Sequence, residues 1–455
     1  MAFNWQQKGW PNATVNRAAL KDELDAFGAA LRDAKSFLRK PQDPEAIARA
    51  LTQEAVKTSA IEGVNVDESV VMSSICRVLG VAYAPKGFTK DLRAEGVAQM
   101  MLAVRADWNK PLTPSLLKRW HRALLSGRED KITIGDFRRH KEPMRVVRRT
   151  AEGELEIRFE APPSERVPEE IGTFIKMWKT PVQKPGDVAL KCAMVHPHFE
   201  SIHPFEDGNG RVGRALVAKM LAEGLGLPLI LPVSTIIARH RVAYYDEINE
   251  ASRSLDWTPW SAFFISILTE TLTEFVAAVR LVSAKRKYLG EYGETLSVRM
   301  RKVVLRMFED GLEGIRSGLS VAKWIRMTKV SKSTATRDLR ELESSGAILA
   351  LGDGPQTRYR LNCSLCEPID PLNEPINGDS IEGVGEGIKA RVFHLVKTYP
   401  GKGMPFLMAA LTVSRATVKR ALIALIAAGK IEHRGSKKTG GYFCLEKPGR
   451  AGARE

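Results

Sequence analysis

Apolar residues recur every three to four positions through most of the first 290 residues, for example over residues 46–63 and 92–108. That spacing places apolar side chains on one face of an α-helix, so this part of the chain is predicted to be mainly helical. Residues 143–161 break the pattern, because apolar and charged residues alternate after a turn at residues 151–153. The alternation predicts a β-hairpin on a helical body.

The C-terminal part of the chain nearly repeats itself at an offset of 83 residues. Residues 330–348 match residues 413–431, and each copy is followed by a short β-type stretch with a tyrosine, Tyr359 or Tyr442. A repeat of this length indicates two copies of one module. Each copy reads as a helix, a turn with a capping serine, a second helix and a hairpin, so the modules resemble winged helix-turn-helix domains.

The positive charge of the chain is concentrated in these two modules. The formal net charge is +16, and most of the excess lies in residues 296–362 and 385–447, whereas residues 363–384 are acidic. The second helix of each copy presents basic side chains, which are Lys332, Arg337 and Arg340 in the first and Arg415, Lys419 and Arg420 in the second. Such faces favour a polyanion such as DNA, but they also suit a protein-docking fold, because charge positions a partner without reading its sequence.

A chain of 455 residues exceeds what one hydrophobic core normally supports, so several domains are expected. The predicted fold class is mainly α: a helical core with a β-hairpin, a helical N-terminal domain before it and two winged-helix (α+β) modules after it. The expected segments are the N-terminal domain (1–105), the core (106–270), a connecting helix (271–295), the first module (296–362), an acidic linker (363–384), the second module (385–447) and a tail (448–455).

The cysteine pattern and the absence of long apolar runs indicate a cytoplasmic protein. The five cysteines are odd in number and scattered, which fits a reducing compartment. Cys363 and Cys366 are close, but no second pair or matching histidines accompany them, so a linker is favoured over a zinc site. No apolar run approaches the ~18–20 residues needed to cross a bilayer, and the first residues lack a secretion-signal profile, so no membrane partner is expected.

The segment with the clearest chemistry runs from His203 to Arg214 and reads HPFEDGNGRVGR. Pro204 disfavours helix at the preceding histidine, while Gly208 and Gly210 tolerate unusual backbone angles and leave amide groups unobstructed. A helical pattern follows directly. A glycine-bearing loop at a helix N-terminus is a ready-made anion site.

Four side chains of this segment suit phosphate chemistry. Arg211 and Arg214 share a helix face in the first turns, where basic residues are unfavourable for the helix dipole unless an anion occupies the end. Asp207 offers an oxygen ligand for a Mg²⁺ that bridges phosphates, and His203 can accept a proton near neutral pH. Together they indicate phosphoryl or nucleotidyl transfer from a polyphosphate.

The segment fills every specified position of the Fic family signature, HPFx[D/E]GN[G/K]RxxR, and the chain resembles that family over roughly residues 106–270. The resemblance implies a protein adenylyltransferase that moves AMP from ATP, with Mg²⁺, to a Ser, Thr or Tyr hydroxyl of a target protein. It assigns the general base to His203 and the metal to Asp207. It assigns ATP binding to Glu62, Phe205, Asp207, Gly208, Asn209, Gly210, Arg211 and Arg214. It also makes the hairpin at 143–161 a flap that binds the target as an added strand.

Two adjacent tyrosines also fit the resemblance. Tyr244 and Tyr245 lie in a stretch that is similar to the family's helix around the adenine, so both are candidates for stacking on ATP. Aromatic residues on a helix are equally compatible with a packed core.

The N-terminal part of the chain resembles the self-inhibited subclass of the family. Residues 58–63 fit the inhibitory motif [S/T]xxxE[G/N], which makes residues 46–63 an inhibitory helix. Glu62 would then pair with Arg214 and compete with the γ-phosphate for the same donors. The stretch 3–11 resembles a helical domain of unnamed function that precedes many bacterial Fic cores.

Other interpretations stay open. The same site can remove AMP, alone or besides adding it, with the inhibitory glutamate positioning water. The chain can also be a DNA-binding regulator with a secondary Fic activity, and it can be a monomer or a homodimer. A metal cluster of His196, His198, His203 and Glu200 is disfavoured, because an HxH pair on a helix points to different faces.

Overall fold

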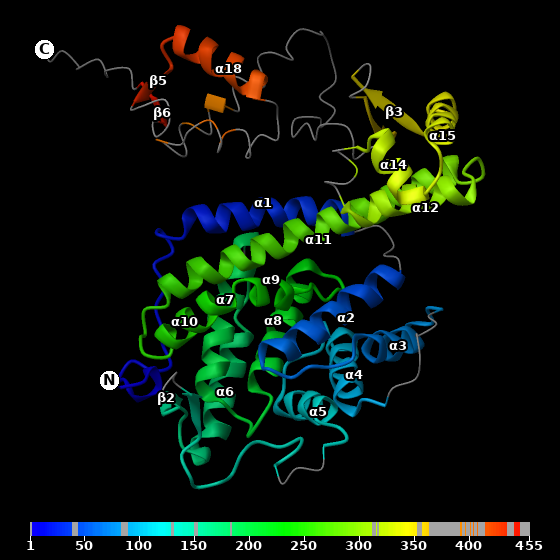
Figure 1. Cartoon of the computed structure of the whole chain (residues 1–455). Coiled ribbons are helices and arrows are strands. Elements are labelled where there is room, and N and C mark those ends of the chain that lie inside the picture. Colours follow the sequence, from blue (N-terminus) through cyan, green and yellow to red (C-terminus); the bar gives the residue numbers. More distant parts are fainter. Residues whose placement is uncertain are drawn as a thin grey trace, which may run out of the picture. The chain divides into compact units, whose positions relative to one another are not determined.

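The computed structural model of the chain is mainly helical (Figure 1) and divides into two compact units, Met1–Ile369 and Asp370–Glu455, which are treated separately below. The structure describes the whole sequence apart from residues 1, 39–43, 83–89, 129–131, 150–152, 183, 312–314, 316–317, 353–356, 364–391, 394–395, 397–400, 402–403, 405–406, 408–414, 435–440 and 446–455.

Helices make up most of the first unit. It begins with η1 (Asn4–Gln6), α1 (Lys21–Leu38), α2 (Pro44–Ile61), α3 (Glu68–Leu79), α4 (Leu92–Ala106) and α5 (Pro114–Leu124). After the hairpin of β1 (Arg145–Arg149) and β2 (Leu155–Glu160) come η2 (Ser164–Arg166), α6 (Val167–Trp178), α7 (Pro185–Ile202), α8 (Asn209–Leu225), α9 (Val233–Arg239), α10 (Arg241–Ala251) and α11 (Thr258–Tyr292). The unit ends with α12 (Val298–Glu309), α14 (Val321–Thr328), α15 (Lys332–Ser344), β3 (Ile348–Leu351) and β4 (Arg358–Leu361).

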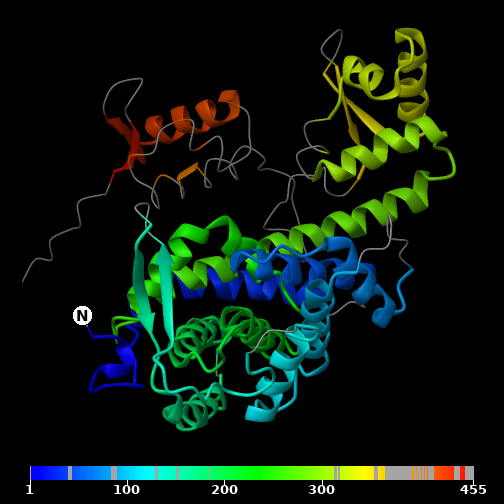
Figure 2. The ribbon, with the colours of Figure 1, turned by 60° about the horizontal axis from the view of Figure 1, so that its bottom comes forward.

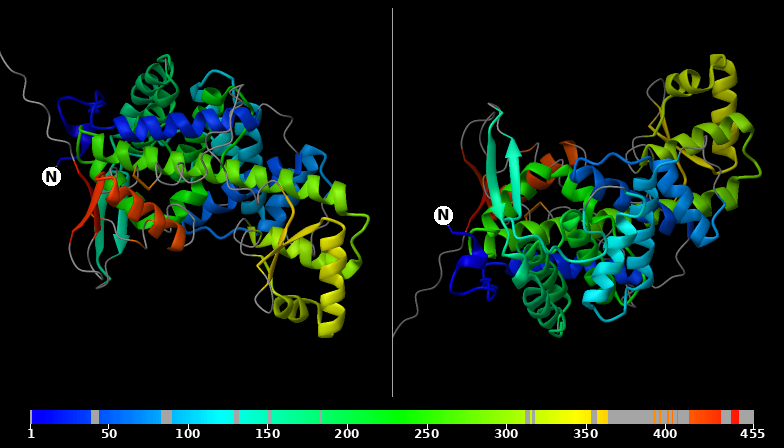
Figure 3. Two further views of the ribbon diagram at one scale, coloured as in Figure 1. Left: turned by 90° about the horizontal axis from the view of Figure 1, so that it is seen from above. Right: turned by 90° about the horizontal axis from the view of Figure 1, so that it is seen from below.

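Helices α7 and α8 pack together at the centre of this unit. Nearly every side chain of α8 is buried, including Val212, Ala215 and Leu216, as expected of a helix surrounded by others. Helix α1 lies along α11 (Figures 1 and 3), and α2 packs against α3, α4 and α9. The segments expected as an N-terminal domain (1–105) and a core (106–270) therefore share one apolar cluster.

Local sequence sets the start of α4 and α5, which both pack against α8. The Thr113 hydroxyl accepts a hydrogen bond from the Leu116 amide at 3.1 Å, and Pro114 occupies the first turn of α5. The Asp91 carboxylate likewise accepts from two amides at the start of α4. These caps satisfy amides that have no partner inside the helix.

Helix α11 differs from what the sequence led us to expect. By length and hydropathy alone it could cross a membrane. Its first half instead packs into the apolar cluster, where Trp260, Phe264 and Leu268 are almost fully buried. The helix continues without a break to Tyr292, so the connecting helix predicted over 271–295 is its second half.

The hairpin predicted over 143–161 is present. Strands β1 and β2 pair in antiparallel fashion, with an irregularity between Val146 and Val147. Within the described residues they form a two-stranded sheet with no third strand.

The last part of the first unit has an apolar core of its own, made by α12, α14, α15 and the β3–β4 hairpin together with the end of α11. A polar contact is buried in it: Asp338 is 1% exposed and accepts two hydrogen bonds from Arg299, each 2.8 Å, and one from the Trp324 indole at 3.2 Å. A buried carboxylate needs such partners to be tolerated.

The second unit repeats these elements. Helix α18 (Arg415–Ala427) and strands β5 (Ile431–Arg434) and β6 (Gly441–Cys444) have the bounds of α15, β3 and β4 shifted by 83 positions, which confirms the repeat. Buried Ala421 stands at the position of Asp338 and buried Leu407 at that of Trp324, so the buried polar contact is replaced by apolar packing. Cys366 and most of the acidic segment 363–384 lie outside the described residues.

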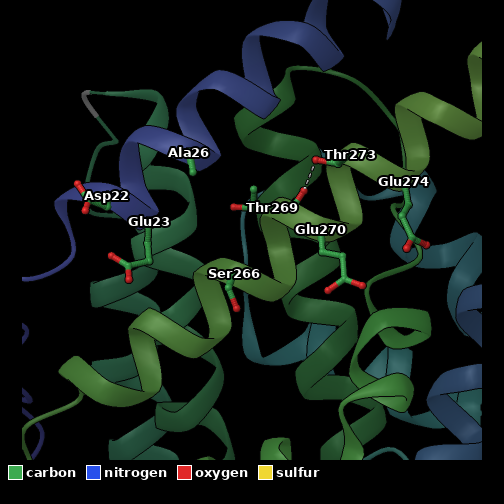
Figure 4. Close-up of a pocket in the computed structure, with 8 residues that line it drawn as sticks. All are labelled: Asp22, Glu23, Ala26, Ser266, Thr269, Glu270, Thr273 and Glu274. Atoms are coloured by element: carbon green, nitrogen blue, oxygen red, sulfur yellow. Dashed lines mark hydrogen bonds between the residues drawn. The ribbon is translucent and has the colours of Figure 1, made fainter. Parts of the chain in front are cut away.

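An open groove lies between α1 and α11 (Figure 4) and is lined by Asp22, Glu23, Ala26, Ser266, Thr269, Glu270, Thr273 and Glu274. Glu270 and Glu274 both form ion pairs with Arg239, at 2.7 and 2.5 Å. None of the lining residues belongs to the segment 203–214. The residues with the chemistry predicted from the sequence lie elsewhere, where α7 meets α8.

Candidate active site

The loop between α7 and α8 turns sharply at both ends. His203 follows the last residue of α7 and has left-handed backbone angles, φ 49° and ψ 58°. Gly208 precedes α8 with φ 86°. A left-handed conformation is unfavourable for a residue with a side chain, so the histidine must be held there by its surroundings.

Three side chains hold the loop. The Asn209 side chain accepts a hydrogen bond from the Phe205 amide (2.9 Å) and donates one to its carbonyl (2.7 Å). The Phe205 ring is fully buried and stacks on His121, with ring centroids 4.0 Å apart. His121 Nδ1 accepts from the Gly135 amide, so Nε2 carries the proton and donates to the Asp207 carbonyl at 2.9 Å.

Arg138 is a further support of the loop that we did not predict from the sequence. Its side chain is 2% exposed and donates to the His203 carbonyl at 2.8 Å and to the Pro162 carbonyl at 2.5 Å. Its amide donates to the Pro204 carbonyl at 2.9 Å. Arg138 thus ties the loop to the segment that follows the hairpin, and no pattern around it in the sequence indicates this role.

His203 is in the form that a general base requires. Its Nδ1 lies 3.3 Å from the Glu200 carbonyl, which can only accept, so Nδ1 carries the proton and Nε2 keeps its lone pair. Burial lowers the pKa of the imidazole to about 4, and the Arg138 guanidinium acts in the same direction. The ring is therefore neutral at physiological pH.

Asp207 lies between two guanidinium groups. Arg211 Nη2 donates to both carboxylate oxygens, at 3.1 and 3.2 Å, and Arg128 forms a second ion pair. Burial raises the pKa of Asp207, but the two arginines outweigh it, so the pKa lies below its usual range. The carboxylate side chain is 38% exposed, which leaves it accessible to a cation. Arg128 is the second residue that sequence reasoning missed.

The two arginines of the motif differ in their partners. Arg211 is buried, and its Nε has no hydrogen-bond partner among the described residues. Arg214 is 1% exposed and pairs with Glu62 at 2.7 Å, as predicted; it also donates to the Thr58 hydroxyl (2.8 Å) and carbonyl (2.9 Å). A buried donor without a partner is costly, which suits a site that takes an acceptor such as phosphate oxygen.

The Glu62 carboxylate lies against the first turn of α8. A Cβ at Gly210 would be 2.1 Å from Glu62 Oε1, so the absence of a side chain there makes room for the carboxylate. The N-terminus of a helix favours negative charge. Glu62 thus occupies part of the anion site that the sequence predicts at this helix end.

The end of α2 is held by hydrogen bonds to three residues of other helices. The Ile61 carbonyl accepts hydrogen bonds from Arg241 (2.8 Å) and from the Tyr245 hydroxyl (2.9 Å). Two turns earlier, buried Glu54 accepts from the amide and the hydroxyl of Ser234, at 2.8 and 2.5 Å, and burial raises its pKa to about 7. The position of Glu62 therefore depends on contacts with α9 and α10.

The two tyrosines have different surroundings. Tyr244 is 2% exposed, and its hydroxyl is hydrogen-bonded to His196 Nε2 at 2.6 Å. Tyr245 is 39% exposed and faces the end of α2. Of the two, only Tyr245 presents a ring that a bound nucleotide could contact without rearrangement, and the stacking role stays a prediction for both.

The histidines and Glu200 of α7 do not converge on one point. His196 contacts Tyr244, whereas His198 Nδ1 lies 3.4 Å from the Met177 sulfur. Within the described residues, no group of three or more His, Cys, Asp or Glu side chains is arranged to hold a metal ion. Burial raises the pKa of Glu200 to about 8, so this carboxyl is largely neutral at pH 7.

Comparison with known proteins shows what the segment around this loop is similar to. Residues 111–221 match the Fic/DOC family, and residues 3–81 match a domain of unknown function, DUF4172. A probable protein adenylyltransferase of Aquifex aeolicus is 38% identical over 94 residues, which are 21% of this chain and 27% of the relative. The protein adenylyltransferase Fic of Aedes aegypti is 34% identical over 92 residues, 20% of this chain and 17% of the relative. The match thus spans about a quarter or less of these relatives.

Among solved structures, a Fic family protein from Desulfovibrio desulfuricans is similar at 20% identity with a TM-score of 0.48, over 77% of this chain and 98% of that one. The matched segment 111–221 contains α5, the hairpin, α7, the loop at His203 and most of α8. The loop at His203 therefore lies within the segment of this chain that is similar to the Fic/DOC family.

Proposed function

We propose that the chain is a protein adenylyltransferase that transfers AMP from ATP to a hydroxyl of a target protein. The observation that carries the proposal is the segment 203–214: it combines a neutral imidazole whose Nε2 keeps its lone pair with a carboxylate and two arginines, at the N-terminus of a buried helix. The Aquifex aeolicus and Aedes aegypti relatives are named protein adenylyltransferases, which supports the same reaction.

In this proposal His203 Nε2 takes the proton from the target hydroxyl. The hydroxyl oxygen then attacks the α-phosphorus, the bond to the β-phosphate oxygen breaks, and pyrophosphate leaves. Arg211, whose Nε has no partner in the part of the chain that the structure describes, and the amides at the start of α8 hold phosphate oxygens. The accessible Asp207 carboxylate fits a Mg²⁺, which when bound would neutralise phosphate charge.

The hairpin is the proposed docking place for the target segment. Val146, Val147 and Ile157 are exposed on it, at 39, 48 and 42%. A two-stranded sheet leaves backbone groups at both edges, and an extended peptide can pair with such an edge as a third strand. The hairpin thus favours a flexible, extended target segment around the modified hydroxyl.

The pairing of Glu62 with Arg214 supports self-inhibition. The carboxylate uses a donor of Arg214 that a γ-phosphate would need, and it lies over the first turn of α8. If ATP bound while Glu62 stayed in place, its phosphates would be displaced from the positions needed for the attack that His203 assists. The chain is therefore proposed to be held in a low-activity state until Glu62 moves.

Incubation with α-³²P-labelled ATP tests the reaction. The full-length Glu62→Gly protein is mixed with a cell lysate and Mg²⁺, and labelled proteins are detected on a gel. Labelling of proteins that is lost when His203 is replaced by alanine supports AMP transfer. If neither labelled protein nor released pyrophosphate is detected, the proposed reaction is contradicted. Loss of AMP from previously labelled proteins, faster with wild type than with His203→Ala, would support the alternative of AMP removal.

The first C-terminal module favours a second function, binding of duplex DNA. Helix α15 has exposed Lys332, Arg337 and Arg340, and a β-hairpin follows it as in a winged helix. Since ATP and DNA are both available in a bacterial cytoplasm, we propose that compartment. Binding to DNA that weakens steeply with salt supports this function, whereas salt-insensitive binding to a protein would support docking.

A further inference from the structure

The first residues of the chain lie against α7, the helix that ends just before His203. Asn4, at the start of η1, is fully buried. Its Nδ2 donates to the Ser201 hydroxyl at 2.8 Å and to the Ala251 carbonyl at 3.1 Å, and its amide donates to the Ser252 carbonyl at 2.7 Å. Ser201 is in the last turn of α7, two residues before His203, so this contact lies directly before the loop at His203.

The same turn holds the hairpin. The Trp5 indole N–H donates to the Glu160 carbonyl at 2.6 Å, at the end of β2. The ring of Phe3 meets that of Phe159 edge-on, with centroids 5.2 Å apart, and Phe159 in turn lies 6.4 Å from the His203 ring. Figures 2 and 3 show this N-terminal segment, in dark blue, beside the base of the hairpin.

The hairpin needs such support. An isolated two-stranded hairpin is at best marginally stable in water, and this one has no third strand among the described residues. Several of its apolar side chains are exposed, so they do not anchor it, whereas Phe159 near its base is 7% exposed. The orientation of the whole hairpin is therefore decided where its base meets the N-terminal turn and the loop at His203.

We propose that residues 3–5 are a clamp that positions the hairpin over His203 for the target hydroxyl, with Asn4 and Trp5 as positioning residues. This assigns a role to the start of the domain of unknown function that matches residues 3–81, and it rests on the proposed adenylyltransferase function. ATP contacts would be unaffected, because they lie on α8 and not on the hairpin. The clamp thus acts on the protein substrate and not on the nucleotide.

Trp5 in the clamp and Trp10 outside it provide a matched pair of variants. Trp5→Phe removes the N–H that holds β2 and keeps an aromatic ring. Trp10→Phe removes the same group from the same segment, but its partner is Glu170 on α6, at 2.8 Å. If the clamp acts through the hairpin, Trp5→Phe should raise hydrogen–deuterium exchange of the β1 and β2 amides several-fold, and Trp10→Phe should leave it unchanged.

The functional measurement uses both variants in the Glu62→Gly background with labelled ATP. Transfer of AMP to lysate proteins should fall about three- to tenfold for Trp5→Phe, which corresponds to the free energy of one hydrogen bond. It should remain at the parental level for Trp10→Phe. Release of free AMP by transfer to water should be the same in all three proteins, because water does not bind along the hairpin.

The clamp proposal would be contradicted if the hairpin amides exchanged at the same rate in Trp5→Phe and Trp10→Phe. It would also be contradicted if Trp5→Phe lowered the release of free AMP as much as the labelling of proteins. If the parent protein transfers AMP to neither protein nor water, the proposed function fails instead. The exchange experiment then still decides whether Trp5 orders the hairpin.

Discussion

Replacing Glu62 by glycine is the sharpest perturbation that the structure suggests. Glu62 touches the site through one carboxylate, which pairs with Arg214 at 2.7 Å and lies over Gly210. The substitution removes this carboxylate and leaves His203, Asp207 and Arg211 in place. AMP transfer should therefore rise.

The size of the effect follows from the contact. A hydrogen bond to a charged group contributes about 1.5–3 kcal/mol, and each 1.4 kcal/mol is tenfold, so productive ATP binding should improve about 10- to 100-fold. Glu62→Gln keeps the shape and loses the charge, so it should give a smaller rise. Glu62→Asp should give partial release, because its shorter side chain reaches Arg214 less well.

The fold should tolerate the change, although Arg214 is buried. Both hydrogen bonds from Arg214 to Thr58 remain. Glu62 contributes to the raised pKa of Glu200, which is about 8, so its removal lets Glu200 ionise more readily and balance the buried guanidinium. A thermal melt of each variant checks this expectation.

The assay is the initial rate of AMP incorporation from labelled ATP into lysate proteins, at several ATP concentrations. Arg214→Ala should abolish incorporation with or without Glu62, because the γ-phosphate then has no anchor. Equal rates for wild type and Glu62→Gly at every ATP concentration would refute the reasoning and make Glu62 an ordinary residue at a helix end.

The remaining predictions concern three other groups. Because the pKa of His203 is about 4, transfer by Glu62→Gly should be nearly constant from pH 8 to about pH 5 and fall only as the pH drops through about 4; an inflection near 6.5 in the pH–rate profile would contradict this. Arg128→Gln should remove one of the two arginine partners of Asp207 and tighten Mn²⁺ binding without nucleotide about two- to fivefold in electron paramagnetic resonance titrations, whereas Arg139→Gln, whose partner is Asp136, should not. Arg337→Gln should lower the salt dependence of DNA binding by about one unit of log–log slope, and Arg49→Gln outside the module should leave it unchanged.

The helical body, the hairpin, the repeat and the loop at His203 follow from the sequence alone. The repeat is found by aligning two segments of the sequence, and the other three features depend on residues that are close in the chain: apolar spacing, glycines next to a helical pattern, and two arginines three positions apart. Local rules act over such short spans, so they can be read without knowing the fold.

Contacts between distant segments could not be read in this way. The family motif indicated that Glu62 and Arg214 meet, but spacing says nothing about residues this far apart, and no motif pointed to Arg128, Arg138 or Asn4. Tyr244 and Tyr245 are adjacent and identical, yet only one is buried. Which face of a helix is covered, and how far burial moves the pKa of His203, depends on how all the helices pack, because desolvation and charge act through space and not along the chain.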